Sequence, residues 1–262
     1  MNEKLQKNIT LYIAIFLTIF TILPILAPIL AHLGLTGFAD IIYSIYQWLC
    51  HQRPWRSYHI FDYQYAMDAR MMLMFGSMTI GAYIVHFKKI KPLTPKLAIF
   101  FAILMTVPLG IDGITQMIAE ITSIKSNSIP FYESTNLIRG LTGLLLGTGF
   151  AFSLFPLLNV GETGNISLKS MAKYIFLSGV VSFLLIPIFV FLWQSTSSTY
   201  LPTSTFIDST RRFPGYNYEI TYGAGHSTIE RIHKSQEIEL FKKRAEKYER
   251  FDLIDEYNES LD

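Results

Sequence analysis

Hydrophobic residues fill long stretches of this chain, and short polar segments separate these stretches. A helix needs about 20 mostly apolar residues to cross a bilayer, so the pattern predicts about five spans. The first carries no charge from Asn8 to Ala31 and lacks a clear cleavage site, which favours an uncleaved span over a signal peptide. The segment from Phe38 to Leu49 is apolar but too short to cross, and it predicts an interfacial or re-entrant helix. The predicted spans cover residues 8–33, 64–87, 96–120, 135–158 and 171–193.

The pattern changes after Trp193. Residues 194–205 are rich in Ser and Thr and predict a linker. Ser227 and Glu230 form a capping-box pattern that opens a charged stretch, which predicts one long surface helix. We therefore expect an all-α fold: a polytopic membrane helix bundle over residues 1–193 and a soluble C-terminal tail over residues 194–262. The tail helix is either simply solvated or the docking site of a protein partner.

Composition agrees with a membrane protein. The chain has 262 residues, of which 50% are hydrophobic, and this is too apolar for an ordinary soluble domain. Its net charge of +2 gives no support to nucleic-acid binding. Cys50 is the only cysteine, which excludes an intramolecular disulfide and a zinc site built from several cysteines.

Lysines give the expected orientation in the cell membrane. Cytoplasmic loops of membrane proteins carry an excess of Lys and Arg. Basic residues lie in the N-terminus, in the loop around residue 90 and near the start of the fifth span, and all three agree if the N-terminus is cytoplasmic. The tail is then extracytoplasmic, although Arg53 and Arg56 in the first outer loop count against this orientation. The lysines concerned are Lys4, Lys7, Lys88, Lys89, Lys91, Lys96, Lys169 and Lys173.

Charged and amide residues gather at the outer end of three predicted spans and in the preceding loop. Charges are costly in hydrocarbon, so an intramembrane ionisable residue is a functional-site hypothesis by default. The structural alternative is that Asp112 forms an ion pair with Arg139 or Arg70 that only holds the helices together. Glycines at helical spacing in the fourth span, Gly140, Gly143 and Gly147, predict close helix packing. The polar cluster comprises His51, Arg53, Arg56, His59, Asp68, Arg70, Asp112, Gln116, Glu120, Glu133, Asn136 and Arg139.

Three segments resemble signatures of a known membrane family. Residues 50–57 read Cys-His-Gln-Arg-Pro-Trp-Arg-Ser and resemble its Cys-His-Gln-x-Pro-x-Arg-Ser motif. Residues 108–116 are similar to its Pro-x-x-Ile-Asp-Gly-x-x-Gln segment, and residues 134–143 to its Ser-x-Asn-x-x-Arg-x-x-x-Gly segment. The family is catalogued as "domain of unknown function 2085", and the resemblance covers about residues 45–150. It implies a fold region and site residues but no reaction.

One departure from the family concerns a metal site. Family members typically carry Cys-Ala-Arg-Cys where this chain has Asp68-Ala-Arg-Met71. In relatives, the resemblance implies a thiolate metal site built from these cysteines and the Cys-His pair. Here Cys50, His51 and Asp68 remain as candidate ligands, and Met71 is a soft, weak ligand. Either the metal has changed or the site has been lost.

Three functions remain open. The first is an enzyme, such as a metal-dependent hydrolase or transferase, that acts on a lipid-linked or anionic headgroup substrate at the outer interface. It could use a divalent or a soft metal ion as cofactor. The alternatives are a non-catalytic scaffold or assembly protein and a transporter subunit. In the enzyme, the catalytic candidates are Asp112, His51 and Gln116, and the substrate-binding candidates are Arg53, Arg56, Arg70, Asn136 and Arg139.

Overall fold

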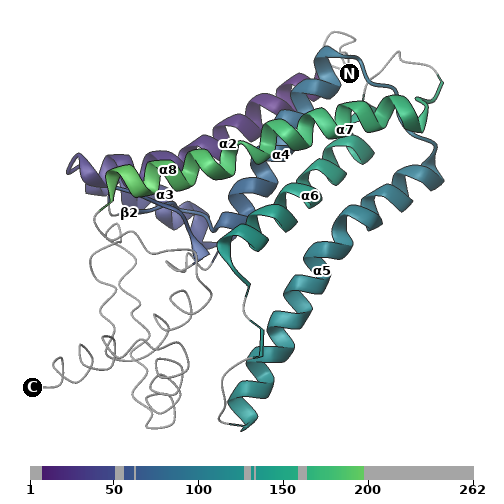
Figure 1. The fold of residues 1–262 in the computed structure, drawn as a ribbon. Coiled ribbons are helices and arrows are strands. Elements are labelled where there is room, and N and C mark those ends of the chain that lie inside the picture. The colour runs from purple at the N-terminus through teal and green to yellow at the C-terminus, as the bar shows by residue number, and fades with distance from the viewer. Residues whose placement is uncertain are drawn as a thin grey trace, which may run out of the picture.

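The fold is an all-α helix bundle with one small β-hairpin, as seen in a computed structural model (Figure 1). The structure describes residues 8–50, 56–61, 63–126, 131–132, 134–158 and 164–197. The C-terminal tail from residue 198, with its predicted surface helix, lies outside the described residues. The helices are α2 (Ile9–His32), α3 (Thr36–Gln47), α4 (Ala69–Phe87), α5 (Pro95–Ser126), α6 (Asn136–Leu154), the 3₁₀ helix η2 (Phe155–Leu158), α7 (Leu168–Phe183) and α8 (Leu185–Thr196). The strands are β1 (His59–Ile60) and β2 (Tyr63–Gln64), which pair antiparallel.

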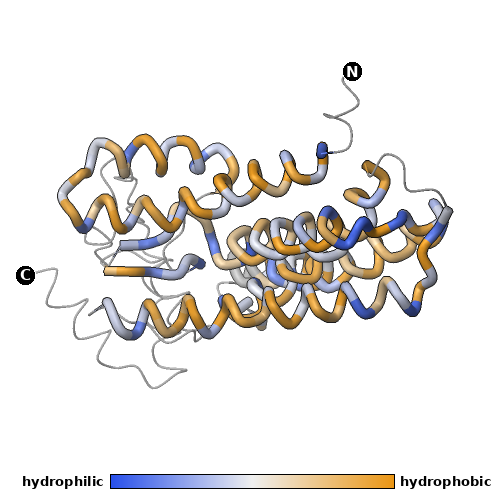
Figure 2. Tube along the Cα trace, turned by 90° about the horizontal axis from the view of Figure 1, so that it is seen from above, coloured by the Kyte–Doolittle hydropathy of each residue, from blue (hydrophilic) through white to orange (hydrophobic). Residues whose placement is uncertain are grey.

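Four helical segments in the described part of the chain are long and apolar enough to cross a membrane. They are Ile9–His32, Pro95–Ala119, Asn136–Leu158 and Leu168–Thr196. Apolar residues run along the helices, as Figure 2 shows in orange. The remaining long helix, α4, is not among the four, and it packs against α2, α6 and α7.

The last span differs from its predicted form. The sequence pattern predicts one helix over residues 171–193, but α7 and α8 meet at Leu184 and together extend from 168 to 196. Pro187 has no N–H to donate to the carbonyl of Phe183, and its ring clashes with that carbonyl. The chain therefore breaks at this turn, although both halves keep the hydropathy of a single span.

Two prolines inside α2 create docking points for other parts of the fold. Proline lacks an N–H, so Pro24 leaves the carbonyl of Phe20 without its helical donor, and Pro28 does the same for the carbonyl of Pro24. The hydroxyl of Tyr46 in α3 donates to the Phe20 carbonyl at 2.7 Å. The N–H of Ala66 donates to the Pro24 carbonyl at 3.1 Å. The prolines thus fix both α3 and the segment that follows β2 against α2.

Glycines set the distance between α4 and α6, as the sequence predicts. A Cβ on Gly143 would lie 2.1 Å from the carbonyl oxygen of Arg70, and one on Gly147 would lie 2.1 Å from that of Met74. The two helices run side by side in the same direction, and Ser77 of α4 donates to the carbonyl of Leu144 at 3.1 Å. This contact confirms the predicted close packing and brings the first turns of both helices to one end of the bundle.

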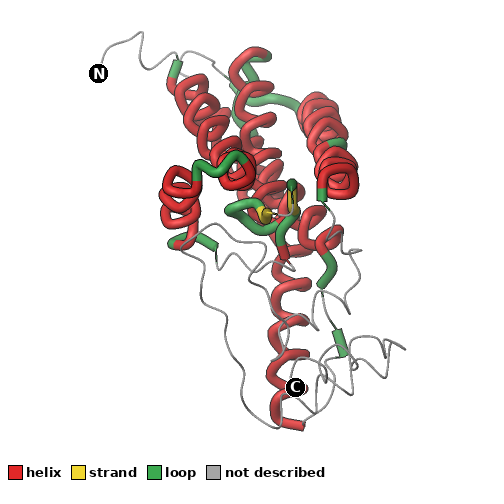
Figure 3. Tube along the Cα trace, turned by 90° about the vertical axis from the view of Figure 1, so that its left-hand side faces the viewer, coloured by secondary structure: helices red, strands yellow, loops and turns green. Residues whose placement is uncertain are grey.

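Helix α5 lies at the side of the bundle. Among the helices it packs chiefly against α6, and its C-terminal part leads away from the other helices (Figures 1 and 3). Its outer face is apolar and exposed at Ile103, Ile111, Ile114 and Ile118. In a membrane protein this face contacts lipid. Asp112 and Gln116 point the other way, because they are 4% and 7% exposed.

Candidate functional site

Two helices, α4 and α6, begin at the site, and each has a side-chain N-cap. The side chain of Asp68 accepts the N–H of Met71 at 2.8 Å and caps α4. Thr135 caps α6 by accepting the N–H of Ile138 at 3.2 Å. N-caps of this kind satisfy backbone donors that a helix end would otherwise leave unpaired. Asp68 therefore has a local structural task in this chain, as the N-cap of α4.

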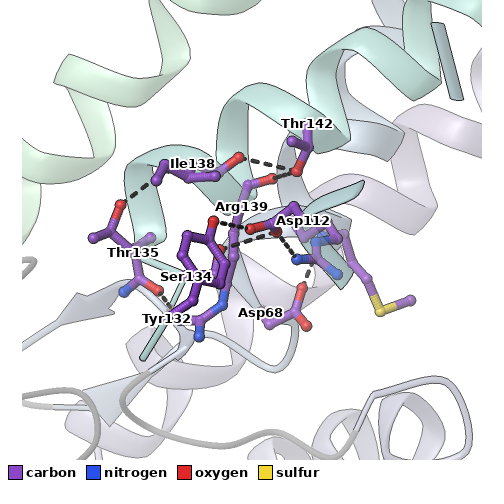
Figure 4. A network of polar contacts seen from close by, with 11 residues as sticks. Asp68, Asp112, Tyr132, Ser134, Thr135, Ile138, Arg139 and Thr142 are labelled. Atoms are coloured by element: carbon purple, nitrogen blue, oxygen red, sulfur yellow. Dashed lines mark hydrogen bonds and ion pairs between the residues drawn. The ribbon is translucent and has the colours of Figure 1, made fainter. Parts of the chain in front are cut away.

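Asp112 on α5 is the centre of the polar network (Figure 4). It forms an ion pair with Arg70, in which Arg70 Nη2 donates to Asp112 Oδ2. The hydroxyl of Tyr132 donates to Oδ1 at 2.5 Å, and that of Ser134 donates to Oδ2 at 2.9 Å. Three donors from two other segments thus converge on one buried carboxylate. Of the two expected partners of Asp112, the structure selects Arg70 for the ion pair.

Arg70 keeps most of its hydrogen-bonding capacity. It sits in the first turn of α4, and its side chain is 24% exposed. Among the described residues, Nη2 is the one guanidinium nitrogen with a hydrogen-bond partner, and Nε is buried without one. Guanidinium groups carry five N–H donors in a fixed fork that suits phosphate and carboxylate groups. Arg70 is therefore oriented by Asp112 and still able to bind an anionic group.

A second row of polar groups lies on α6. Arg139 Nη1 donates to Asn136 Oδ1 at 3.1 Å, and Asn136 Nδ2 lies 3.5 Å from the carbonyl oxygen of Ser57. Asn136 is fully buried and Arg139 is 2% exposed. This row connects the start of α6 to the segment that leads into β1. The half-buried Arg56 directly precedes Ser57 in that segment.

Tyr132 holds its proton more tightly than an ordinary tyrosine. Burial raises the pKa of Tyr132, and its hydrogen bond to the Asp112 carboxylate raises it further. Ser134 and Arg139 act in the opposite direction on this pKa but do not reverse the shift. The hydroxyl therefore remains a donor at neutral pH.

The structure unites most of the predicted site residues that it describes. Arg70 and Asp112 meet directly, Asn136 and Arg139 form the adjacent row, and Gln116 is buried on α5 one turn after Asp112. Tyr132 and Ser134 were not predicted as site residues. Hydroxyl residues are common in loops; Ser134 was marked only as the first residue of the Ser-x-Asn-x-x-Arg segment, and Tyr132 only by lying seven residues before Arg139.

The predicted metal ligands are only partly described. Cys50 is buried three residues after the end of α3, and Asp68 already accepts a backbone N–H through Oδ1. His51 and Arg53 lie outside the described residues. Among the described residues, no three His, Cys, Asp or Glu side chains come together as a metal site. The described donors alone are thus too few to define a metal centre.

Comparisons with known proteins give one family model and one similar protein. A family model described as "Predicted membrane protein (DUF2085)" matches residues 50–153. An uncharacterised protein of Methanocaldococcus jannaschii is 30% identical over 138 residues, which cover 48% of this chain and 78% of that protein. No solved structure matches. The matched region includes the start of α4, the centre of α5 and all but the last residue of α6, so it contains the whole polar network.

Proposed function

This chain belongs to the DUF2085 family of predicted membrane proteins, and its relative from Methanocaldococcus jannaschii is uncharacterised, so we propose a function from the geometry of the polar network. The protein binds the anionic headgroup of a membrane lipid or lipid-linked substrate at the polar network and acts on it as an enzyme. The observation that carries this proposal is Arg70, a partly exposed guanidinium that Asp112 orients and whose other donors have no partner among the described residues.

The neighbouring groups have distinct tasks in this proposal. Asp112 already accepts three hydrogen bonds. It is therefore better suited to positioning Arg70 and Tyr132 than to accepting a proton as a general base. Tyr132 holds its proton too tightly to be a good general acid at neutral pH, and its hydroxyl instead fixes the Asp112 carboxylate. Gln116 and Asn136 orient the substrate, and Arg139 supports the anionic group from α6. His51, Arg53 and Arg56 remain candidates from the preceding segment, with His51 as acid, base or ligand of a metal held with Cys50 and Asp68.

The proposal includes an orientation. Lysines around residue 90 and in the short N-terminus favour a cytoplasmic N-terminus. The polar network then lies toward the outer face of the cell membrane, where headgroups are accessible. The tail beyond residue 197 is then extracytoplasmic and offers a docking segment for a protein partner.

A second candidate is a non-catalytic assembly protein. The three hydrogen bonds to Asp112 join α4, α5 and the segment before α6, which is what an interhelical latch requires. A latch would make the network important for folding alone. The two candidates therefore differ in whether a well-folded variant loses function.

The test compares lipid composition in cells that produce wild-type protein, Arg70→Gln or Arg139→Ala. Lys173→Ala, an exposed cation on α7, is the matched control. We expect normal amounts of each protein in the membrane, with headgroup composition altered by wild type and Lys173→Ala but not by the two site variants. If both site variants are folded and act on lipids as wild type does, the enzyme proposal is wrong. If they fail to accumulate while the control does, the latch is the better explanation.

A further inference from the structure

The chain reverses its direction directly after α2, and α3 runs back along that helix. The N–H of Gly34 donates to the carbonyl of Ala31 at 3.0 Å, and that of Leu35 donates to the carbonyl of Leu30 at 2.9 Å. This pair of bonds is a Schellman motif, which requires the left-handed φ of 77° that Gly34 adopts. The motif ends at Leu35, directly before the first residue of α3, so α2 and α3 pack together as a helical hairpin.

The far end of α3 reaches the middle of α2. The Tyr46 hydroxyl donates to the carbonyl of Phe20 at 2.7 Å, and the two rings lie with their centroids 5.1 Å apart. Phe20 is at the middle of α2, which has 24 residues and ends at His32. At a rise of 1.5 Å per residue, Tyr46 therefore lies about 18 Å from the end of α2 at which α3 begins. The hydrocarbon core of a bilayer is about 30 Å thick, so α3 extends to about half of that depth.

The side of α3 that faces away from α2 is apolar and exposed. Tyr43 and Tyr46 are buried on the inner side. On the other side, an open groove of about 660 Å³ follows the helix and also includes Asp40 and Ser44. We call the exposed side the open face of α3, and its residues are Phe38, Ile41, Ile45, Trp48 and Leu49, with exposed fractions from 52% to 87%.

The composition of α3 suits hydrocarbon better than the membrane surface. A helix that lies in the interface has a strongly polar face, usually rich in Lys and Arg. Residues 36–49 contain neither, and Asp40 is their one charged residue. Asp40 lies only about 6 Å from the start of α3, whereas Ile45, Trp48 and Leu49 lie further along it. The charge is thus at the shallow end, and the open face becomes wholly apolar toward the deep end.

The chain comes back to the surface after α3. Phe61, in the turn between β1 and β2, stacks on His32 at the end of α2, with ring centroids 4.3 Å apart. The segment between Leu35 and Phe61 therefore begins and ends at the same level of the bundle. Between these two points it reaches the level of Phe20. This is the path of a re-entrant element.

We propose that α3 is a re-entrant helix whose open face contacts the acyl chains of the leaflet on the side of the polar network. Cys50, whose N–H donates to the carbonyl of Tyr46 at 2.9 Å, then lies within the membrane. The first signature of the family consequently starts at membrane depth and not in an aqueous loop. This lipid contact is independent of what the polar network binds.

The test measures the depth of spin labels in the full-length protein, reconstituted in phospholipid vesicles. Phe38→Cys, Ile45→Cys and Trp48→Cys each place a nitroxide on the open face. Relaxation by oxygen, which concentrates in hydrocarbon, is compared with relaxation by a water-soluble nickel chelate, and the ratio reports depth. We expect the label at residue 48 to lie about 15 Å deeper than the label at residue 38, with residue 45 between them.

Two further positions and the unmodified protein calibrate the measurement. Ile22→Cys carries the label on an exposed apolar position of α2, and Lys169→Cys carries it on an exposed position at the start of α7. Ile22→Cys should be relaxed mainly by oxygen and Lys169→Cys mainly by nickel. Wild type treated in the same way reports any label on Cys50, which is buried.

Native fluorescence gives a second readout without an added cysteine. Lipids with bromine near the ends of their acyl chains should quench Trp48 more strongly than lipids with bromine near the headgroup. Trp48→Phe measures what the other tryptophans contribute to the signal. Equal quenching by both kinds of lipid, after this contribution is subtracted, would contradict the depth given to Trp48.

Three results with the spin labels would overturn the proposal. Equal, shallow depths at all three positions would identify an interfacial helix. Strong relaxation of the label at residue 48 by nickel would place the open face in water. Weak relaxation by both reagents would mean that protein covers this face, and dipolar broadening between labels would then identify a second copy as the cover in place of the C-terminal tail.

Discussion

The closest helix contact in the bundle allows a sharp test of how the site is assembled. Gly143 of α6 faces the carbonyl of Arg70, and the substitution Gly143→Ala would place a Cβ 2.1 Å from that oxygen. Ordinary contacts of this kind begin at 3.4 Å, so the helices would have to separate by about 1.3 Å. The obstacle is backbone, which cannot rotate away as a side chain can.

The expected magnitude follows from two opposing effects. Gly→Ala in an open helix stabilises by about 0.5–1 kcal/mol, because alanine loses less backbone entropy. Overpacking a close contact costs about 1–3 kcal/mol. Gly143→Ala should therefore destabilise the protein by about 1–2 kcal/mol. Gly179→Ala in α7, where no atom lies within 4 Å of the new Cβ, should stabilise it slightly.

The assay is equilibrium unfolding in mixed micelles, with SDS as denaturant and helical circular dichroism as the signal. The separation should also move Arg70 relative to Asp112, so Gly143→Ala should bind the anionic lipid phosphatidic acid more weakly, whereas Gly179→Ala should bind it normally. Equal or greater resistance of Gly143→Ala to SDS, compared with Gly179→Ala, would refute the argument from close approach.

Two further predictions concern hydrogen bonds outside the helix contact. In an otherwise wild-type protein, Tyr46→Phe should lower the free energy of unfolding in SDS by about 1 kcal/mol. The same substitution should cost less in a Pro24→Ala background, because the N–H of Ala at residue 24 would donate to the Phe20 carbonyl. An equal cost in both backgrounds would contradict the role given to Pro24. The Tyr132 hydroxyl has a raised pKa in the folded protein, so its stabilising contribution should be complete below pH of about 10 and be lost as pH rises through the folded-state pKa. Between neutral and strongly alkaline pH, the Tm of Tyr132→Phe should accordingly fall less than the Tm of wild type. Tyr12→Phe, on the exposed face of α2, is the control and should behave as wild type does.

The polar network shows how far the sequence could lead toward the site. Asp112, Arg70, Asn136 and Arg139 were identifiable because charges and amides within apolar stretches are rare and have to be compensated. The choice of Arg70 as the ion-pair partner was not predictable, because either arginine is compatible with the same hydropathy pattern. Tyr132 was missed, and Ser134 was noted only as part of a sequence segment, because hydroxyl residues between spans are unremarkable until a carboxylate is seen to face them.

The hairpin was missed for a related reason. Its strands have two residues each, too few to give an alternating pattern in the sequence. His59 was one of several histidines near a predicted interface, yet it is 2% exposed and stacks on Trp193 with ring centroids 4.6 Å apart. Contacts between residues more than a hundred positions apart define this part of the molecule.

The sequence by itself determined the all-α membrane bundle and the existence of a polar cluster, because hydropathy and length add up locally along the chain. The tertiary structure decided the break before Pro187, the docking of α3 on the Phe20 carbonyl of α2, and the partners of Asp112. These features depend on how each helix is rotated against its neighbours. Backbone contacts at Gly143 and Gly147 set that rotation between α4 and α6, and a contact of this kind exists only after two distant segments have packed together.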